Sequence, residues 1–105
     1  MKRIDDNFKY FATKHKDIYE AYKNYGQLVH QEGGPLEDKT RALLKVVISS
    51  VSDHDYALET HMKKAIDAGC SREEIEHGIL LTAPTVGFPN MMESLLVMRG
   101  FFDKE

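Results

Sequence analysis

Apolar residues recur along the chain at intervals of three and four, and the alternating pattern of a β-strand is nearly absent. This spacing predicts an all-α fold, a small bundle of about five to six helices. A first helical segment is predicted over residues 6–29, with a change of phase near residues 13–15 that indicates two helices meeting at a bend. Gly33, Gly34 and Pro35 are expected to end this segment, because they favour a turn over a helix.

The next two helices have recognisable start and stop signals. The helix over residues 37–52 carries apolar residues around most of its circumference, which predicts that it is central and the most buried. Ser52 or Asp53 is expected to cap the helix that follows. That helix should reach Ala68, with Gly69 in the left-handed position that ends many helices.

The capping box in Ser71-Arg72-Glu73-Glu74 is the most specific local signal in the sequence. It opens a helix that is expected to kink or stop near Pro84. The stretch "TVGFPN" predicts a turn, after which Asn90 is expected to cap a last helix rich in methionine and aromatic residues.

The length of 105 residues predicts a single domain, residues 1–105. A composition of 42% hydrophobic and 30% charged residues is typical of a soluble globular protein. The 17 acidic residues outnumber the 14 basic ones and no basic block is present, so nucleic-acid binding is not expected. A single cysteine favours a cytoplasmic location. No secretory signal or membrane-spanning stretch is expected, since the apolar runs are short.

His61 is the first candidate for chemistry. Leu58, His61, Met62 and Ala65 stand at i, i+3, i+4 and i+7, so the imidazole is expected on the apolar side of its helix. One interpretation is a core histidine with a hydrogen-bond partner, as buried polar groups normally have. The other is a general acid or base, because histidine titrates near neutral pH. The pattern leaves both open.

His54 is the second candidate site residue. It lies about 20° from His61 around the helix and about 10.5 Å from it along the axis. The two imidazoles therefore share one side, but they are too far apart to bind one metal ion. A substrate or a chain of waters could lie between them. The alternative is an exposed residue in the first helical turn, although a histidine cation is not favoured there. No metal and no cofactor are expected.

Cys70 and the other histidines are assigned no chemistry. Cys70 lies near a helix N-terminus, which can lower a thiol pKa. However, it occupies the hydrophobic-staple position before Ser71, and no second cysteine is present to resolve a sulfenate. His77 is expected at the surface or in an interface, and His15 and His30 are expected at helix ends.

Residues 36–94 resemble the carboxymuconolactone decarboxylase and AhpD-like (alkyl hydroperoxidase D-like) family. The resemblance is carried by the helix that contains His61, by the segment "AIDAGCSREEIEHGI" and by the "GFP" turn. It implies a small all-α bundle that assembles as a homo-trimer or homo-hexamer, with its sites near subunit boundaries.

The redox branch of that family uses a C-x-x-C motif, a histidine four residues later and a glutamate on the preceding helix. By this resemblance, its cysteine positions fall on His54 and Ala57, its glutamate on Ala42 and its other histidine on Tyr56. His61 alone keeps the functional group. Thiol peroxidase chemistry by that mechanism is therefore not expected.

The decarboxylase branch lacks the C-x-x-C motif, keeps the histidine at the position of His61 and has a G-x-P turn like "GFP". It implies loss of CO₂ from an unsaturated lactone without metal or organic cofactor, and a histidine acid is suited to protonate the resulting carbanion. The acidic residue that this branch often has before the histidine is Ala57 here. Arg41 or Arg72 would have to supply the cation for substrate carboxylates.

The function expected from this resemblance is a cofactor-independent decarboxylase or lyase acting on a small cyclic or lactone carboxylate. His61 would be its general acid or base, and His54 a second polar group in the same cleft. A non-catalytic oligomeric binding protein of the same fold is the alternative, and an AhpD-like peroxidase is a disfavoured third interpretation.

Overall fold

The computed structural model describes residues 2–103, and in this range the chain is helical with no strand. It contains six longer α-helices, the four-residue helix α6 and one π-helical segment, η1, so the all-α prediction is confirmed. The chain divides into two compact units, Met1–Pro35 and Leu36–Glu105, which are described separately below. The prediction of a single domain over residues 1–105 stays a prediction.

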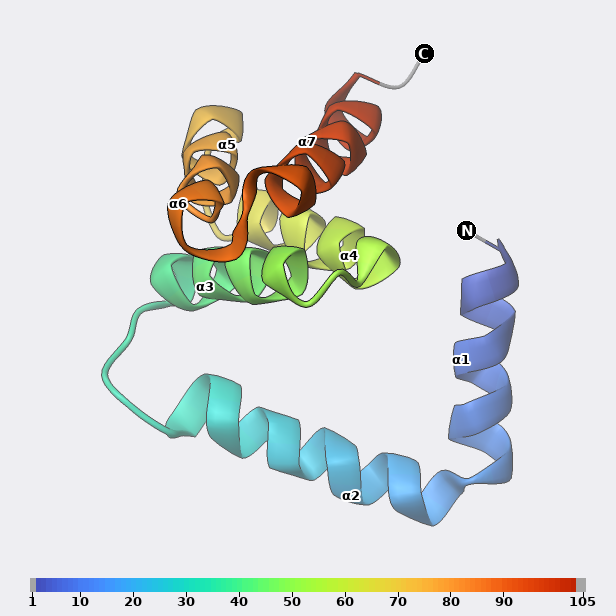
Figure 1. The fold of residues 1–105 in the computed structure, drawn as a ribbon. Helices are drawn as coiled ribbons and strands as arrows, with labels where there is room; N and C mark the ends of the chain where they lie inside the picture. The colour runs from blue at the N-terminus through green and yellow to red at the C-terminus, as the bar shows by residue number, and fades with distance from the viewer. Residues whose placement is uncertain (1, 104–105) are drawn as a thin grey trace. The chain divides into compact units, whose positions relative to one another are not determined.

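The first unit consists of α1 (Lys2–Lys14), α2 (Lys16–Gln27) and η1 (Leu28–Glu32). The predicted bend is present, because α1 and α2 meet at a corner at His15 (Figure 1). Aromatic rings pack across this corner: Tyr19 makes edge contacts with Phe8 and Phe11, at 5.6 and 6.2 Å between ring centroids. The π-helical segment after α2 was not predicted.

The helices of the first unit expose their apolar sides. Neither α2 nor η1 has a buried residue, and Ile18, Tyr22 and Tyr25 are each at least 60% exposed. These three residues stand at i, i+4 and i+7 and therefore form one apolar stripe along α2. The described part of this unit thus makes a corner of two amphipathic helices without a core.

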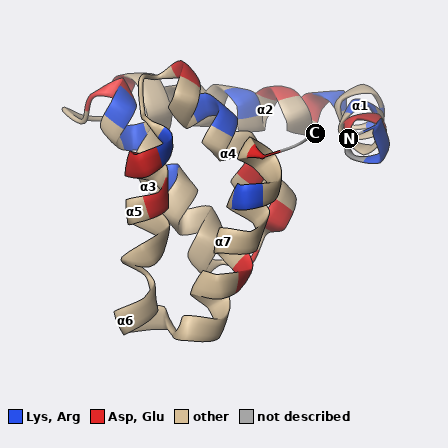
Figure 2. Ribbon diagram, turned by 90° about the horizontal axis from the view of Figure 1, so that it is seen from above, with Lys and Arg blue, Asp and Glu red and all other residues tan. Residues whose placement is uncertain are grey.

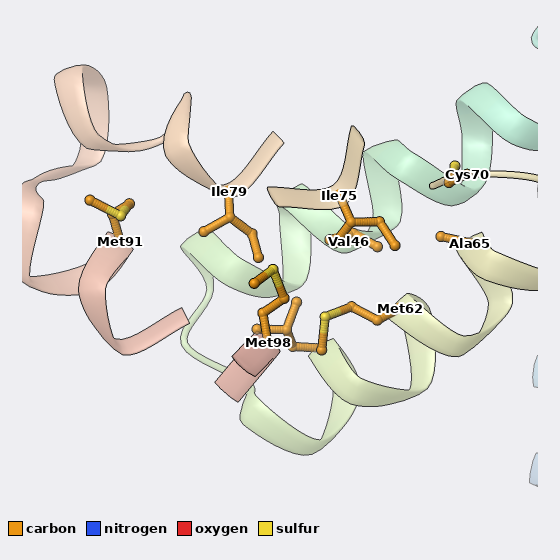
Figure 3. Packing of buried hydrophobic residues seen from close by; sticks show 9 residues of the cluster. Val46, Met62, Ala65, Cys70, Ile75, Ile79, Met91 and Met98 are labelled. Atoms are coloured by element: carbon orange, nitrogen blue, oxygen red, sulfur yellow. The ribbon is translucent and has the colours of Figure 1, made fainter. Parts of the chain in front are cut away.

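The second unit contains the hydrophobic core. Its helices are α3 (Asp38–Val51), α4 (Asp55–Asp67), α5 (Arg72–Leu80), α6 (Ala83–Val86) and α7 (Phe88–Phe102). A short turn joins α3 to α4, and α5 and α7 lie across this pair (Figure 1). The buried apolar residues of the core are Val46, Leu58, Met62, Ala65, Cys70, Ile75, Ile79, Met91 and Met98. In Figure 3 the side chains of Met62 and Met98 lie together below Ile75 and Val46.

The prediction that the helix over residues 37–52 is central and the most buried is confirmed, but its burial is not complete. The helix α3 packs against α4, α5 and α7, and ten of its fourteen residues are buried or partly buried, the largest share of any helix in the described residues. In α3 the buried residues are Val46, Ser49 and Ser50, while the side chains of Leu44 and Ile48 are 45% and 53% exposed. Leu44 and Ile48 project from the side of the helix opposite Val46, where no element of this unit packs. The apolar residues of α3 therefore lie on two faces of the helix: one packs in the core and the other is exposed.

The signals at the start of α5 were predicted correctly. The Ser71 hydroxyl accepts a hydrogen bond from the Glu74 N–H at 3.0 Å, and the Glu74 carboxylate accepts one from the Ser71 N–H at 2.8 Å. The carboxylate also forms an ion pair with Lys39 of α3 at 3.1 Å. Gly69 has a φ of +104°, the positive value expected of a glycine just after a helix.

Two other predicted caps are absent. The residue before α4 is His54, and Asp53 adopts a left-handed conformation with φ of +59°. Gly87, with φ of +125°, precedes α7, so Asn90 lies inside the first turn. There its side-chain amide donates a hydrogen bond to the Ser50 carbonyl at 3.1 Å. Asn90 thus ties α7 to α3 where the sequence predicted a cap.

The helix that starts at the capping box stops before Pro84, as predicted. The last residue of α5 is Leu80, and Pro84 lies in the first turn of α6, where its missing N–H costs nothing. In the part of the chain that the structure describes, no helix has both the length and the apolarity needed to cross a lipid bilayer.

Candidate functional site

His61 lies at the edge of the buried side of α4. Leu58, Met62 and Ala65 on the same helix are at most 1% exposed, whereas His61 is half-buried. The predicted apolar stripe is therefore correct for three of its four members. His61 thus stands at the edge of the core, where packing holds its side chain while part of it stays accessible to solvent.

The structure places His54 directly before α4, with its side chain exposed. The His54 N–H donates to the Ser49 carbonyl at 3.2 Å, and its carbonyl accepts from the Leu58 N–H at 2.8 Å, so the backbone of this residue is fixed at both ends. His54 precedes the first residue of α4 in a non-helical backbone conformation, and the rise of an α-helix puts it about 10.5 Å from His61 along the axis. The two residues can flank one ligand, but they cannot bind one atom together.

No metal centre forms in the part of the chain that the structure describes. No group of three or more histidine, cysteine or acidic side chains there is close enough to hold a metal ion.

The two arginines expected to supply a cation are both bound to carboxylates. Arg41 interacts with Asp38 and with the Leu36 carbonyl. Arg72 donates to the two carboxylate oxygens of Asp103 at 2.7 and 3.2 Å, and its guanidinium lies 5.2 Å from the ring centre of Phe102. These contacts hold the end of α7 against the start of α5.

Lys64 is a cation of α4 that the sequence analysis overlooked. It lies three residues after His61, which puts the two Cβ atoms about 5–6 Å apart on one side of the helix. The spacing rule that placed His61 beside Leu58 could have identified Lys64.

Cys70 is part of the core. Its side chain is 4% exposed, and its Sγ lies 3.7 Å from the Lys39 carbonyl as a weak donor. Burial, followed by the nearby carboxylate of Glu74, raises the pKa of the Cys70 thiol. Cys70 and Ile75 bracket the Ser71 cap and belong to the same buried cluster, as the hydrophobic-staple interpretation requires (Figure 3).

The remaining histidines belong to other elements than α4. His77 is exposed on α5, His15 stands between α1 and α2, and His30 lies in the last turn of η1. Two shallow hollows on the first unit are lined by residues of α1 and of the α1–α2 corner, and neither includes a residue of α4.

Residues 16–100 fit the sequence model of the carboxymuconolactone decarboxylase family, which is most of the chain. No sequence among the curated proteins matches. The match includes α4 with both of its candidate histidines and extends beyond residues 36–94, where the resemblance is strongest.

Proposed function

Since the chain belongs to the carboxymuconolactone decarboxylase family, we propose that it is a cofactor-independent lyase that removes CO₂ from a small cyclic or lactone carboxylate. The observation that carries this proposal is the position of His61, half-buried beside the core residues Leu58 and Met62. An imidazole held in this way is suited to proton transfer near neutral pH.

The proposed reaction requires one proton donor. The bond between the ring carbon and the carboxylate breaks, CO₂ leaves, and the electron pair spreads into the unsaturated lactone as a dienolate. The protonated imidazole of His61 then gives its proton to a carbon of the dienolate and is restored by a proton from water. His54 is the second polar group of the proposed site, suited to contact the far end of a ligand that His61 protonates.

Thiol peroxidase chemistry is disfavoured by the state of the single cysteine. A peroxidatic thiol has to be exposed and ionised, whereas Cys70 is buried and the pKa of its thiol is raised. The resemblance to the redox branch implies that His54 and Ala57 occupy the positions of its two cysteines. We also propose a cytoplasmic location, because a chain with one cysteine has no disulfide to form within itself.

Substitution of His61 tests the proposed function. We expect His61→Ala to lower the turnover of an unsaturated lactone carboxylate at least about 100-fold, as loss of a general acid does. His77→Ala is the matched control, since His77 is exposed on α5, and its turnover should stay within about twofold of the original. Loss of the substrate absorbance and release of CO₂ are the measurements, and circular dichroism checks folding. His61→Gln keeps a polar side chain there if His61→Ala does not fold.

The outcomes separate the two functions that the family match leaves open. Binding of the carboxylate without turnover by the unaltered chain would favour a non-catalytic binding protein of the same fold. Turnover that survives in a folded His61 variant would show that this imidazole is not the acid.

We further propose that the protein is a homo-oligomer whose second copy covers an uncharged end of the second unit. Residues 78–92 contain no lysine, arginine, aspartate or glutamate, and Figure 2 shows α6 wholly in tan. Such depletion of charge is typical of the centre of a protein interface. Within this segment the exposed large apolar side chains are Leu80, Leu81, Val86, Phe88 and Met92.

A charge placed in this segment tests the assembly. Phe88 is 63% exposed in the first turn of α7, where aspartate suits the helix N-terminus, so Phe88→Asp should fold and yet weaken the contact between copies. Gly100→Asp is the control, because a Cβ there meets no atom within 4 Å. Light scattering after gel filtration should give a trimer or hexamer for the unaltered chain and for Gly100→Asp, and a smaller species for Phe88→Asp. A mass of 12.0 kDa for the unaltered chain at all concentrations would refute the assembly.

A further inference from the structure

The proposed function requires a cation beside His61, because its substrate is a carboxylate. The basic side chains of the second unit divide into those bound to an acid and those that are not. In the described residues four of them form ion pairs: Lys39 with Glu74, Arg41 with Asp38, Lys63 with Asp67, and Arg72 with Asp103. Both arginines suggested by the sequence are thus already neutralised.

A cation in reach of His61 lies on the same helix. Lys64 is exposed and forms no ion pair in the described residues, and it lies one turn after His61 on the same side of α4. Its closest acid by spacing is Asp67, three residues later, but the carboxylate of Asp67 is 3.5 Å from the Nζ of Lys63. Lys45 of α3 and Arg99 of α7 also form no ion pair in the described residues, and of these three cations Lys64 is the one that helix geometry places within one turn of His61.

Lys63 and Lys64 differ in direction although they are neighbours. Lys64 lies about 60° from His61 around the helix, whereas Lys63 lies about 160° away, on the opposite side. An anion held by Lys64 would therefore contact the imidazole of His61, and an anion held by Lys63 would not. We propose that Lys64 is the residue that binds the ligand carboxylate next to His61. This inference rests on the proposed function for the choice of ligand.

Binding of benzoate, a simple cyclic carboxylate, tests this role without requiring turnover. Benzoate is titrated into the full chain while the imidazole signal of His61 is followed by NMR. We expect Lys64→Ala to weaken benzoate binding about tenfold, the effect of losing one charge-assisted hydrogen bond. Lys64→Arg should restore most of the affinity, and Lys63→Ala should bind within about twofold of the unaltered chain.

The salt dependence of benzoate affinity is a second measurement, and it would not change on substitution of a lysine with a purely structural role. Because the contact is a charge pair at an exposed site, added sodium chloride should weaken benzoate binding to the unaltered chain more than to Lys64→Ala. Equal weakening by Lys63→Ala and Lys64→Ala, or a His61 signal that benzoate does not shift, would overturn the proposal. Benzoate binding that depends on Lys64 in a protein with no decarboxylase activity would support the anion site and refute the proposed reaction.

Discussion

At the scale of single residues, Cys70 shows how burial decides chemistry. It precedes a helix, a place where a thiol can be activated, but its side chain is packed among Ala65 and Ile75 and is 4% exposed. Burial, followed by the Glu74 carboxylate, disfavours the thiolate more than the Lys39 ammonium favours it, so the pKa of the Cys70 thiol rises. The thiol therefore behaves as a small apolar side chain.

We predict that Cys70 reacts slowly with a thiol reagent in the folded protein. At pH 8 the rate of reaction with a disulfide reagent should be at least about tenfold lower in the native protein than in the guanidinium-unfolded chain, because both burial and the raised pKa lower the thiolate available. Stopped-flow absorbance measures both rates. Equal rates would show that the α3–α5 junction opens freely.

The same pKa shift has a defined effect on stability. A raised pKa means that the folded protein favours the neutral thiol of Cys70. The contribution of this thiol to the free energy of unfolding is therefore complete below the pKa of the unfolded chain, about 8.5. It declines as the pH rises from that value toward the pKa of the folded protein. Cys70→Ala should therefore lose less stability than the unaltered chain between neutral and alkaline pH. Denaturant melts at several pH values measure this difference.

At the scale of elements, the capping box fixes where α5 begins. We predict that Ser71→Ala lowers the free energy of unfolding by about 1 kcal/mol, the usual effect of removing an N-cap hydroxyl. Ser52→Ala is the control, since Ser52 is exposed and its side chain makes no hydrogen bond in the described residues. Chemical denaturation measures both. Equal losses would mean that the hydrogen bond to the Glu74 N–H contributes nothing.

Signals confined to a few residues could be predicted from the sequence, and those set by packing could not. Ser71 and Gly69 act on backbone groups within three residues of themselves, so their spacing suffices. Asn90 was expected to act locally too, but its amide reaches the Ser50 carbonyl on another helix. Likewise the uncovered face of α3 depends on where α5 and α7 lie. The half-buried position of His61 is also set by packing between helices, so the sequence alone could not predict it.

At the scale of the whole molecule, the stabilising core belongs to residues 36–105. All nine residues of the buried apolar cluster lie between Val46 and Met98, while α2 and η1 bury none. Helices as short as α1 and α2 are marginal in water when nothing covers their apolar faces. The periodicity predicted that these segments are helical, but periodicity does not reveal whether an apolar face is covered.

We predict that the two units differ in their ability to fold alone. A fragment of residues 36–105 should keep its helical circular dichroism and a cooperative thermal transition, because its core is complete. A peptide of residues 1–35 should show little helix at 25 °C. A fragment 36–105 without a cooperative transition would indicate that the first unit is needed to complete the fold.

The buried hydrogen bond between the hydroxyls of Ser50 and Ser94, 2.6 Å long, links the sequences of α3 and α7. Replacing either serine with alanine leaves the other hydroxyl buried, at a cost of about 1–3 kcal/mol, whereas replacing both can be nearly neutral. An evolutionary change from two serines to two alanines must therefore pass through a less stable protein that has one serine and one alanine at these positions. Among relatives, these two positions are expected to vary together, serine with serine or alanine with alanine, although 43 residues lie between them in the chain.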